Sequence, residues 1–197
     1  MSDPLSTLAL ATGGAFLGKF VGPAAESLGK VAWERAQQLG QKATAMLSAV
    51  GREPQSVEPK VLLPLVQAAS LEANETLAEM WTALLANAAD PAEYVAVQPS
   101  FSEVLRQLTL MDAHILAHLY APAGSTATEP MLSGVMVKTL VVSFASTYEQ
   151  VTLSIDNLLR LQLCRGIDTV AKGIGPANIA GTTYGHYFIK ACMPPKS

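Results

Sequence analysis

Apolar residues recur at helical spacing through most of the first 120 positions. Between residues 23 and 50 six of them follow one another at steps of four and three, and these six are small or medium in size. A narrow stripe of this kind is typical of close packing between two helices. The stripe consists of Ala32, Ala36, Leu39, Ala43, Met46 and Val50. We expect Ala36, Leu39, Ala43 and Met46 to pack against a helix of the same chain or of a second copy.

Prolines and a polar cap mark the ends of the next two helices. Pro59 predicts the start of one helix, which Pro64 should kink because proline lacks a backbone donor and clashes with the preceding turn. Asn74 is the expected N-cap of the second helix, which Asp90 and Pro91 end. The expected core of this region comprises the second helix's apolar positions and one later aromatic: Leu77, Trp81, Leu84, Leu85, Ala88 and Phe101.

Three further helix starts are marked by a hydroxyl residue followed three positions later by an acid. The pairs are Ser100 with Glu103, Thr109 with Asp112, and Ser146 with Glu149. The first two predict short amphipathic helices. The third predicts a longer helix, whose apolar residues are Val151, Ile155, Leu158, Leu159 and Leu161.

The last 35 or so residues carry the pattern of a hairpin. GIDTV and TTYGHYFIKAC flank the glycine-rich stretch KGIGPANIAG, so we expect two strands around a glycine-rich tip. Two helices followed by a hairpin are typical of a winged helix. The sequence therefore predicts an all-α, mainly helical protein with a small C-terminal winged-helix-like α+β module.

Composition shifts divide the chain into three expected segments. Residues 1–22 form a glycine-spaced apolar segment, 23–120 a helical body, and 131–193 the winged-helix-like module. The break before the module is the stretch 121–130, which is rich in Pro, Gly, Ser and Thr.

Charge and cysteine content limit the classes of protein to which this chain can belong. Only 15% of the 197 residues are charged, against about 25% in ordinary soluble domains, so we expect a partner, a second copy or lipid to cover part of the surface. The net charge of −3 argues against general affinity for nucleic acid. Cys164 and Cys192 fit reduced thiols in a cytoplasmic protein, and Asp3 stands where a signal peptide would carry a base.

Four stretches of the chain together resemble a known bacterial family. They are LLPLVQAASLEANETLAEMWTALLANAADP, VQPSFSEVLRQLTLMDAHIL, SIDNLLRLQLC and TTYGHYFIKAC. The chain resembles the Abi-alpha (abortive infection) family over roughly residues 25–193, most specifically at Leu71–Pro91 and Pro99–Phe101. The resemblance implies a helical body, a C-terminal winged-helix-like module and a role in phage defence. In one departure, Gln162 replaces the glycine of the family's L-x-R-L-G-L-I-type segment.

No motif predicts catalysis, a cofactor or a metal site. His114 and His118 share one helix face at a spacing that can hold zinc, but two further ligands would have to come from elsewhere. The glycines at 173 and 175 are not followed by the Lys-Ser/Thr pair of a phosphate-binding loop, and no GxSxG nucleophile elbow occurs. We therefore do not expect an enzyme.

A winged helix also raises the hypothesis of a DNA-binding regulator, which needs cations on its second helix. Between Ser146 and Cys164 the charged residues are Glu149, Asp156 and Arg160, which sum to −1. The weak candidates for nucleic-acid contact are Arg160, Arg165 and Lys172. DNA binding is therefore the second alternative function.

The first alternative function is based on the N-terminal segment. Gly14, Gly18 and Gly22 recur at four-residue steps, a spacing that lets helices approach closely in a membrane. Lys19 is the only charged residue between Leu5 and Ala25, and this stretch approaches the length of a bilayer span. These residues predict self-association, and the alternative is an effector that associates with or permeabilises the inner membrane. The competing interpretation is an arm covered by a partner.

These observations favour a bacterial anti-phage protein that acts by protein association without catalysis. Its expected partner is another protein or a further copy of the chain.

Overall fold

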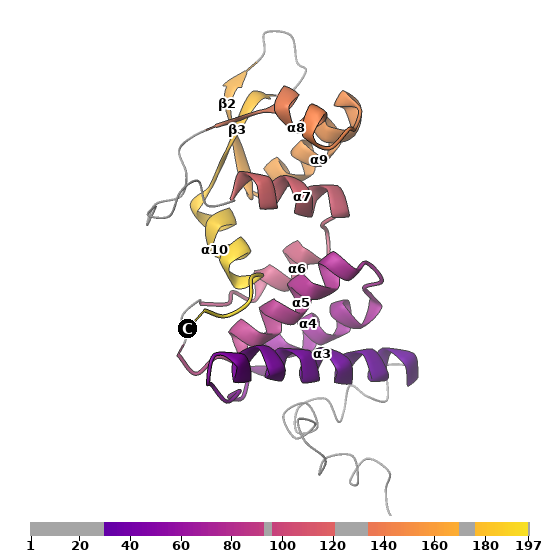
Figure 1. Ribbon diagram of the computed structural model, residues 1–197, viewed down its shortest axis with the longest axis vertical. Coiled ribbons are helices and arrows are strands. Elements are labelled where there is room, and N and C mark those ends of the chain that lie inside the picture. Colours follow the sequence, from indigo (N-terminus) through magenta and orange to yellow (C-terminus); the bar gives the residue numbers. More distant parts are fainter. Residues whose placement is uncertain (1–29, 93–95, 121–133, 170–175, 197) are drawn as a thin grey trace, which may run out of the picture. The chain divides into compact units, whose positions relative to one another are not determined.

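The computed structural model describes residues 30–92, 96–120, 134–169 and 176–196 (Figure 1). The chain divides into two compact units. The helical unit comprises the chain up to Arg106 together with Ala191–Ser197, and the mixed unit comprises Gln107–Lys190. The border therefore lies ahead of the helix that begins near Thr109, and not in the 121–130 stretch that the sequence predicted as the break.

Four described helices form the helical unit (Figure 1). They are α3 (Lys30–Ala49), α4 (Pro59–Leu71), α5 (Glu75–Ala88) and α6 (Ser100–Leu105). Helix α3 packs against α4 and α5, and α4 also contacts α5 and α6. The largest fully buried side chains here are those of Leu47, Leu62, Leu65, Trp81, Leu84, Leu85, Phe101 and Leu105.

The predicted stripe of small residues lies on α3. Ala36, Leu39 and Ala43 are buried, and Met46 is half-buried. Alanine at positions 36 and 43 of this stripe lets the backbone of α3 come close to its neighbours, which are α4 and α5 of the same chain. This part of α3 therefore packs within the chain.

The proline and asparagine signals locate α4 and α5 correctly. Pro59 is the first residue of α4, where its missing N–H leaves no partner unsatisfied, and the helix continues through Pro64. The side chain of Asn74 caps α5 by accepting a hydrogen bond from the backbone N–H of Leu77 at 3.2 Å. Helix α5 then ends at Ala88, just before Asp90.

Capping boxes are expected at Ser100 and at Thr109, and the one at Thr109 has the predicted residues. The Thr109 hydroxyl accepts from the N–H of Asp112 at 3.2 Å, and the Asp112 carboxylate accepts from the N–H of Thr109 at 2.8 Å. The position of the box at Ser100 is wrong, because the N-cap of α6 is Pro99, which has no side-chain cap; Glu103 pairs with Arg106 at 2.7 Å.

The helix start predicted at Ser146 lies one residue later and carries a capping box of its own. Thr147, not Ser146, is the N-cap of α9 (Tyr148–Arg160), and its reciprocal partner is Gln150, not Glu149. Both hydrogen bonds of this box are 3.2 Å long.

The mixed unit places helices beside a three-stranded antiparallel sheet (Figure 1). Its elements are α7 (Leu110–Leu119), β1 (Val135–Met136), α8 (Val137–Ser143), α9, β2 (Cys164–Thr169), β3 (Pro176–Gly181) and most of α10 (Thr183–Ala191). The strand order is β1–β3–β2, with Val135 opposite Ile179 and Cys164 opposite Gly181. This confirms a mainly helical protein with a small C-terminal α+β module.

The predicted position of the second strand of the hairpin is wrong. TTYGHYFIKA forms α10, and the second strand is PANIAG, which the sequence placed in the glycine-rich tip. The hydroxyl of Thr182 accepts from the N–H of Gly185 at 2.9 Å and so caps the helix. Gly185, Phe188, Ile189 and Ala191 are buried within the helix and Cys192 just after it, so burial does not alternate as it would in a strand.

Tyr120 joins the end of α7 to the sheet. Its hydroxyl donates to the carbonyl oxygen of Leu163 at 2.6 Å and accepts from the N–H of Thr182 at 2.9 Å. Burial raises the pKa of Tyr120, which keeps the donating proton in place. A Cβ at Gly185 would overlap the Tyr120 hydroxyl and the Leu163 carbonyl, so glycine is required where α10 begins.

Candidate functional site

Helix α9 is the most strongly two-sided element of the mixed unit. Its inner face buries Val151, Ser154, Ile155 and Leu158. That face contacts α7, α8 and β2. The helix is thereby fixed by three neighbours, and its opposite face remains at the surface.

The outer face of α9 carries four exposed side chains at steps of four, three and four residues. They are Glu149, Leu153, Asp156 and Arg160, which we call the α9 stripe. Leu153 is 74% exposed. The Arg160 guanidinium donates to the side-chain oxygen of Asn157 at 2.6 Å, which uses one of its five N–H groups. The stripe thus places one apolar residue among two acids and a base.

A buried carboxylate holds α9 against α7. The amide of Asn157 donates to Asp112 at 2.9 Å and to the carbonyl oxygen of Gln107 at 3.1 Å. Asp112 is fully buried, and its second carboxylate oxygen has no hydrogen-bond partner among the described residues. The stripe is therefore presented by a helix whose orientation is set from beneath by a polar contact as well as by packing.

The same carboxylate influences a nearby thiol. Burial, with a smaller contribution from the negative charge of Asp112, raises the pKa of Cys164 to about 12. Burial alone raises the pKa of Cys192. Both thiols therefore stay protonated at neutral pH, the form that is a poor nucleophile.

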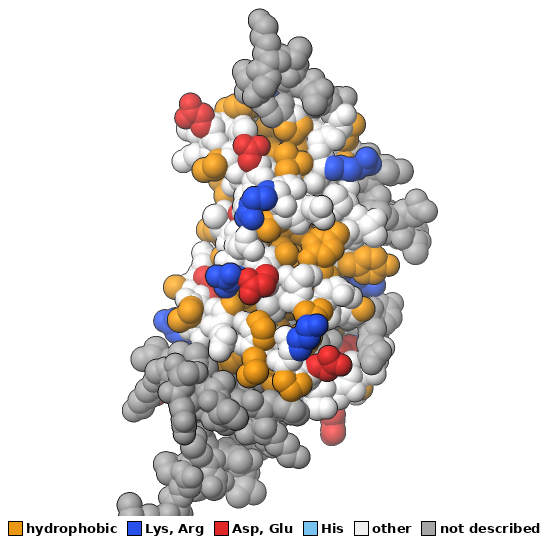
Figure 2. Space-filling model, turned by 180° about the vertical axis from the view of Figure 1, so that it is seen from behind, with side chains coloured by type: hydrophobic (Ala, Val, Ile, Leu, Met, Phe, Trp, Pro, Cys, Tyr) orange, Lys and Arg blue, Asp and Glu red, His pale blue; other side chains and the backbone are white. Residues whose placement is uncertain are grey.

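Further large apolar side chains are exposed elsewhere in the mixed unit. Val142 on α8 is 80% exposed, Met136 on β1 59% and Ile167 on β2 46%. Figure 2 shows hydrophobic side chains at several places on the surface, with few charged ones between them. These three side chains lie on different elements, and single exposed apolar residues are common on protein surfaces.

Two of the residues predicted as weak nucleic-acid contacts are exposed. Arg160 lies at the end of α9, where it shares the stripe with Glu149 and Asp156, and Arg165 lies on β2. Lys172 lies outside the described residues. Arg160 and Arg165 therefore lie on different elements, and Arg160 shares its helix face with two acids.

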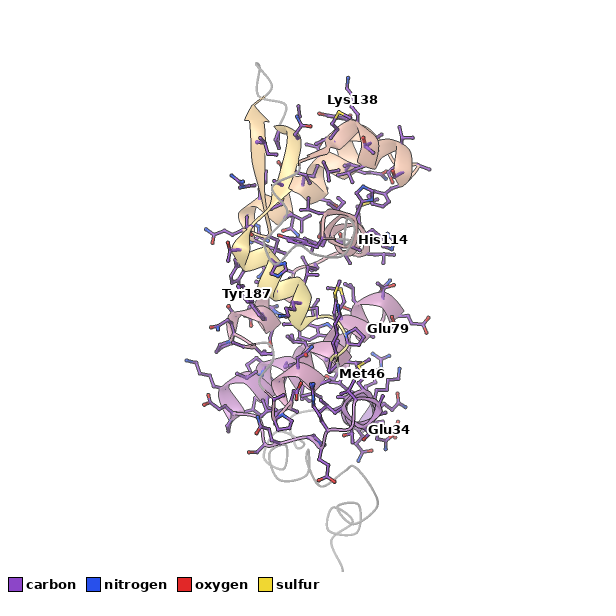
Figure 3. The ribbon with its side chains drawn as sticks, turned by 60° about the vertical axis from the view of Figure 1, so that its left-hand side comes forward. Glu34, Met46, Glu79, His114, Lys138 and Tyr187 are labelled. Atoms are coloured by element: carbon purple, nitrogen blue, oxygen red, sulfur yellow. The ribbon has the colours of Figure 1, made fainter. Side chains whose placement is uncertain are left out.

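The two histidines of α7 contact an aromatic ring. The rings of His114 and His118 lie 6.1 and 6.2 Å from that of Phe144, and Figure 3 shows His114 on this helix. Within the part of the chain that the structure describes, no three His, Cys, Asp or Glu side chains come close enough to hold a metal ion. The pair thus packs around Phe144, which follows α8.

The glycine-spaced segment is not part of the described structure. Gly14, Gly18, Lys19 and Gly22 all lie outside the described residues, as does the stretch 173–175. Among the helices that are described, none combines the length and the hydrophobicity needed to cross a bilayer. The predictions about self-association and membrane contact at residues 5–25 stay predictions.

Sequence reasoning did not single out Leu153 or Tyr120. Leu153 could have been found from its place opposite Val151 and Ile155 on a helical wheel. Tyr120 carried no local signal, because its partners Leu163 and Thr182 are distant in sequence.

Comparison with known proteins places this fold in a family. The family model described as abortive infection alpha matches residues 34–192. The chain belongs to the abortive infection alpha family. The match runs from α3 to the residue after α10 and so includes both units and the α9 stripe. Searches of curated proteins and of solved structures gave no significant match.

Membership of the abortive infection alpha family implies a role in abortive infection, the anti-phage response for which the family is named. The family name describes an outcome for the infected cell and specifies no chemistry. The molecular mode of action must therefore be argued from the surface of this abortive infection alpha protein.

Proposed function

We propose that this protein serves abortive infection by binding another protein chain through the α9 stripe, without catalysis of its own. The mixed unit is interpreted as a winged-helix module. Its order of α7, β1, α8, α9, β2 and β3, with the sheet order β1–β3–β2, supports this interpretation. Helices α8 and α9 then form the helix-turn-helix pair, α9 is the second helix, and β2 and β3 form the wing.

The charge of the α9 stripe is the observation that supports a protein, and not DNA, as its partner. A second helix that enters the major groove meets phosphates and base edges with cations and hydrogen-bond donors. Here Glu149 and Asp156 would bring two carboxylates toward the phosphates, and Arg160 alone would oppose them. The acidic balance therefore disfavours DNA at this face.

Leu153, the leucine of the α9 stripe, favours a protein as the partner. Leu153 is 74% exposed to solvent. Complete burial of a leucine side chain in an interface contributes about 1.5–3 kcal/mol to the free energy of association. An apolar anchor surrounded by charged groups is the usual composition of a protein-binding patch. The absence of catalysis in this proposal is supported by the two buried, protonated thiols and by the packing role of the histidine pair.

The test is phage protection in cells that carry Leu153→Glu. We expect this variant to lose protection while its purified protein keeps the wild-type circular dichroism spectrum and melting temperature. Leu71→Glu is the matched control, because Leu71 is 75% exposed but lies at the end of α4 in the helical unit. Protection that survives Leu153→Glu would refute the proposal.

A gel-shift titration at low salt tests the DNA alternative. Electrostatic contacts to phosphates are strongest at low salt, so a DNA-binding module should shift random duplex DNA under these conditions. We expect no shift. A shift that disappears in Arg160→Ala would favour the DNA-binding regulator instead.

A further inference from the structure

The α9 stripe has a spacing that is the same in both directions. Its steps of four, three and four residues place the pair Glu149 and Arg160, and the pair Leu153 and Asp156, symmetrically about one point between Ser154 and Ile155. Steps of four and three residues also keep the four side chains on one line along the helix. The stripe can therefore face a copy of itself that runs in the opposite direction.

We propose that the partner of the α9 stripe is the α9 stripe of a second copy, in an antiparallel pair with twofold symmetry. This inference rests on the proposed function, because it names the chain that the protein-binding face receives. Twofold association requires a patch that complements itself, and this patch does so by charge.

The outer positions supply the charge complementarity. In the antiparallel register, Glu149 of each copy faces Arg160 of the other, so two opposite-charge pairs close the two ends of the contact. The guanidinium of Arg160 already donates to Asn157 and keeps four further N–H groups that can meet a carboxylate. Reversing the charge at Glu149 and at Arg160, separately and together, therefore tests this arrangement specifically.

The inner positions supply the apolar contact. In this register Leu153 of each copy faces Asp156 of the other. The two leucines are offset by three residues, or about 4.5 Å along the helix axis, so they contact each other diagonally at the centre. Each leucine is then removed from the water that surrounds 74% of it in one copy. One pair of 13-residue helices is a small interface, so we expect a weak dimer.

The same register brings the two Asp156 carboxylates together, which opposes association. The self-pairing model therefore predicts that Asp156→Asn strengthens the dimer. A basic protein partner would instead use Asp156 as a point of attraction, so this substitution would weaken its binding. The sign of the Asp156→Asn effect separates the two kinds of partner.

The experiment is sedimentation equilibrium of the full chain at about 10–300 µM, a range suited to weak interfaces. We expect a concentration-dependent dimer in the wild type. Glu149→Lys and Arg160→Glu should each weaken it by about tenfold or more, because each substitution turns both attractive pairs into repulsive ones. An equimolar mixture of the two variants should restore association, because opposite charges again face each other in the heterodimer.

Leu153→Ser should also abolish the dimer, and Leu71→Ser is the equally exposed control that should not. Circular dichroism checks that each variant is folded. A wild-type chain that stays monomeric over this range, or a dimer that neither charge substitution affects, would overturn the proposal. If the chain stays monomeric but Leu153→Glu still loses phage protection, only the self-pairing has failed and a different protein occupies the stripe.

Discussion

Gln162 adopts a backbone conformation that its side chain disfavours. Its φ angle is +59°, in the left-handed region where a Cβ crowds the backbone and glycine is preferred. The residue lies between α9 and β2, and its carbonyl oxygen accepts from the hydroxyl of Thr182 at 2.6 Å. The glycine of the family's pattern would meet the same backbone requirement without this penalty.

We predict that Gln162→Gly stabilises the protein by about 0.5–1 kcal/mol, since relief of the left-handed penalty exceeds the added freedom of the unfolded chain. Urea unfolding followed by circular dichroism measures the change. Gln162→Ala retains a Cβ and should give no such gain. Equal stabilisation by both substitutions would show that backbone strain is not the cause.

The two thiols should resist alkylation in the folded protein. Since the pKa of Cys164 is raised to about 12, only about one molecule in ten thousand carries the thiolate at pH 8. Cys192 is buried and its pKa is also raised. We expect iodoacetamide to label both residues at least about a hundredfold faster in 8 M urea than in buffer. Rapid native labelling of either residue, measured by mass spectrometry, would contradict this.

At the scale of elements, the starts of α9 and α10 depend on local caps. Helix α9 begins at a reciprocal box between Thr147 and Gln150, and α10 begins at the hydroxyl of Thr182. The start of α10 is also held by Tyr120 through its contact with Thr182. The orientation of the α9 stripe and the course of the chain after β3 therefore depend on a few hydroxyl groups.

Thr147→Ala should destabilise the mixed unit by about 1 kcal/mol, because the N–H of Gln150 loses its acceptor. Ser146→Ala is the control, since Ser146 precedes the cap and its hydroxyl donates only to the carbonyl of Phe144. Thermal unfolding compares the two variants. A larger loss for Ser146→Ala would place the cap at the residue that the sequence first suggested.

Gly185→Ala should destabilise the protein by about 1–3 kcal/mol or more, because the new methyl group would overlap the Tyr120 hydroxyl and the backbone of Leu163. Thr183→Ala changes an exposed position on the same helix and should leave stability nearly unchanged. Chemical denaturation measures both. An unchanged midpoint for Gly185→Ala would show that the contact relaxes without penalty.

At the scale of the whole molecule, the chain leaves the helical unit after Arg106 and returns to it at Ala191. The returning segment is anchored there. The amide of Asn87 donates to the carbonyl oxygens of Ala191 at 2.9 Å and of Met193 at 2.7 Å. Arg52 donates to the carbonyl oxygen of Lys196 at 2.9 Å and pairs with buried Asp90 at 2.5 Å. Both ends of the mixed unit are thus covalently continuous with the helical unit.

The membrane hypothesis belongs to this scale and has its own test. Full-length protein and a version that starts at Glu26 are compared in liposome flotation and dye leakage. Under the membrane hypothesis, only the full-length chain floats and releases dye, and Gly18→Leu abolishes both effects because it blocks close helix approach. If neither version binds liposomes, residues 5–25 have no membrane role and the protein-association proposal stands alone.

The sequence by itself determined the elements whose signals are local. The helical stripe of α3, Pro59 at the start of α4, the Asn74 cap of α5 and the Thr109 box of α7 all depend on residues within one or two turns of each other. The family resemblance likewise follows from linear patterns, and the family match confirms it. These features could be predicted because backbone caps and helical periodicity act over a few residues.

Only the tertiary structure decided which surfaces face inward and which remain outside. The pattern of α3 left open a partner in the same chain or in a second copy, and the packing of α4 and α5 against it settles this for the described residues. TTYGHYFIKA became a helix because Thr182 caps it and because Gly185 fits beneath Tyr120, a residue 65 positions earlier in the chain. Leu153 stands out only once Val151 and Ile155 are seen to be buried. Burial and long-range contact are properties of the folded chain, which linear spacing alone does not specify.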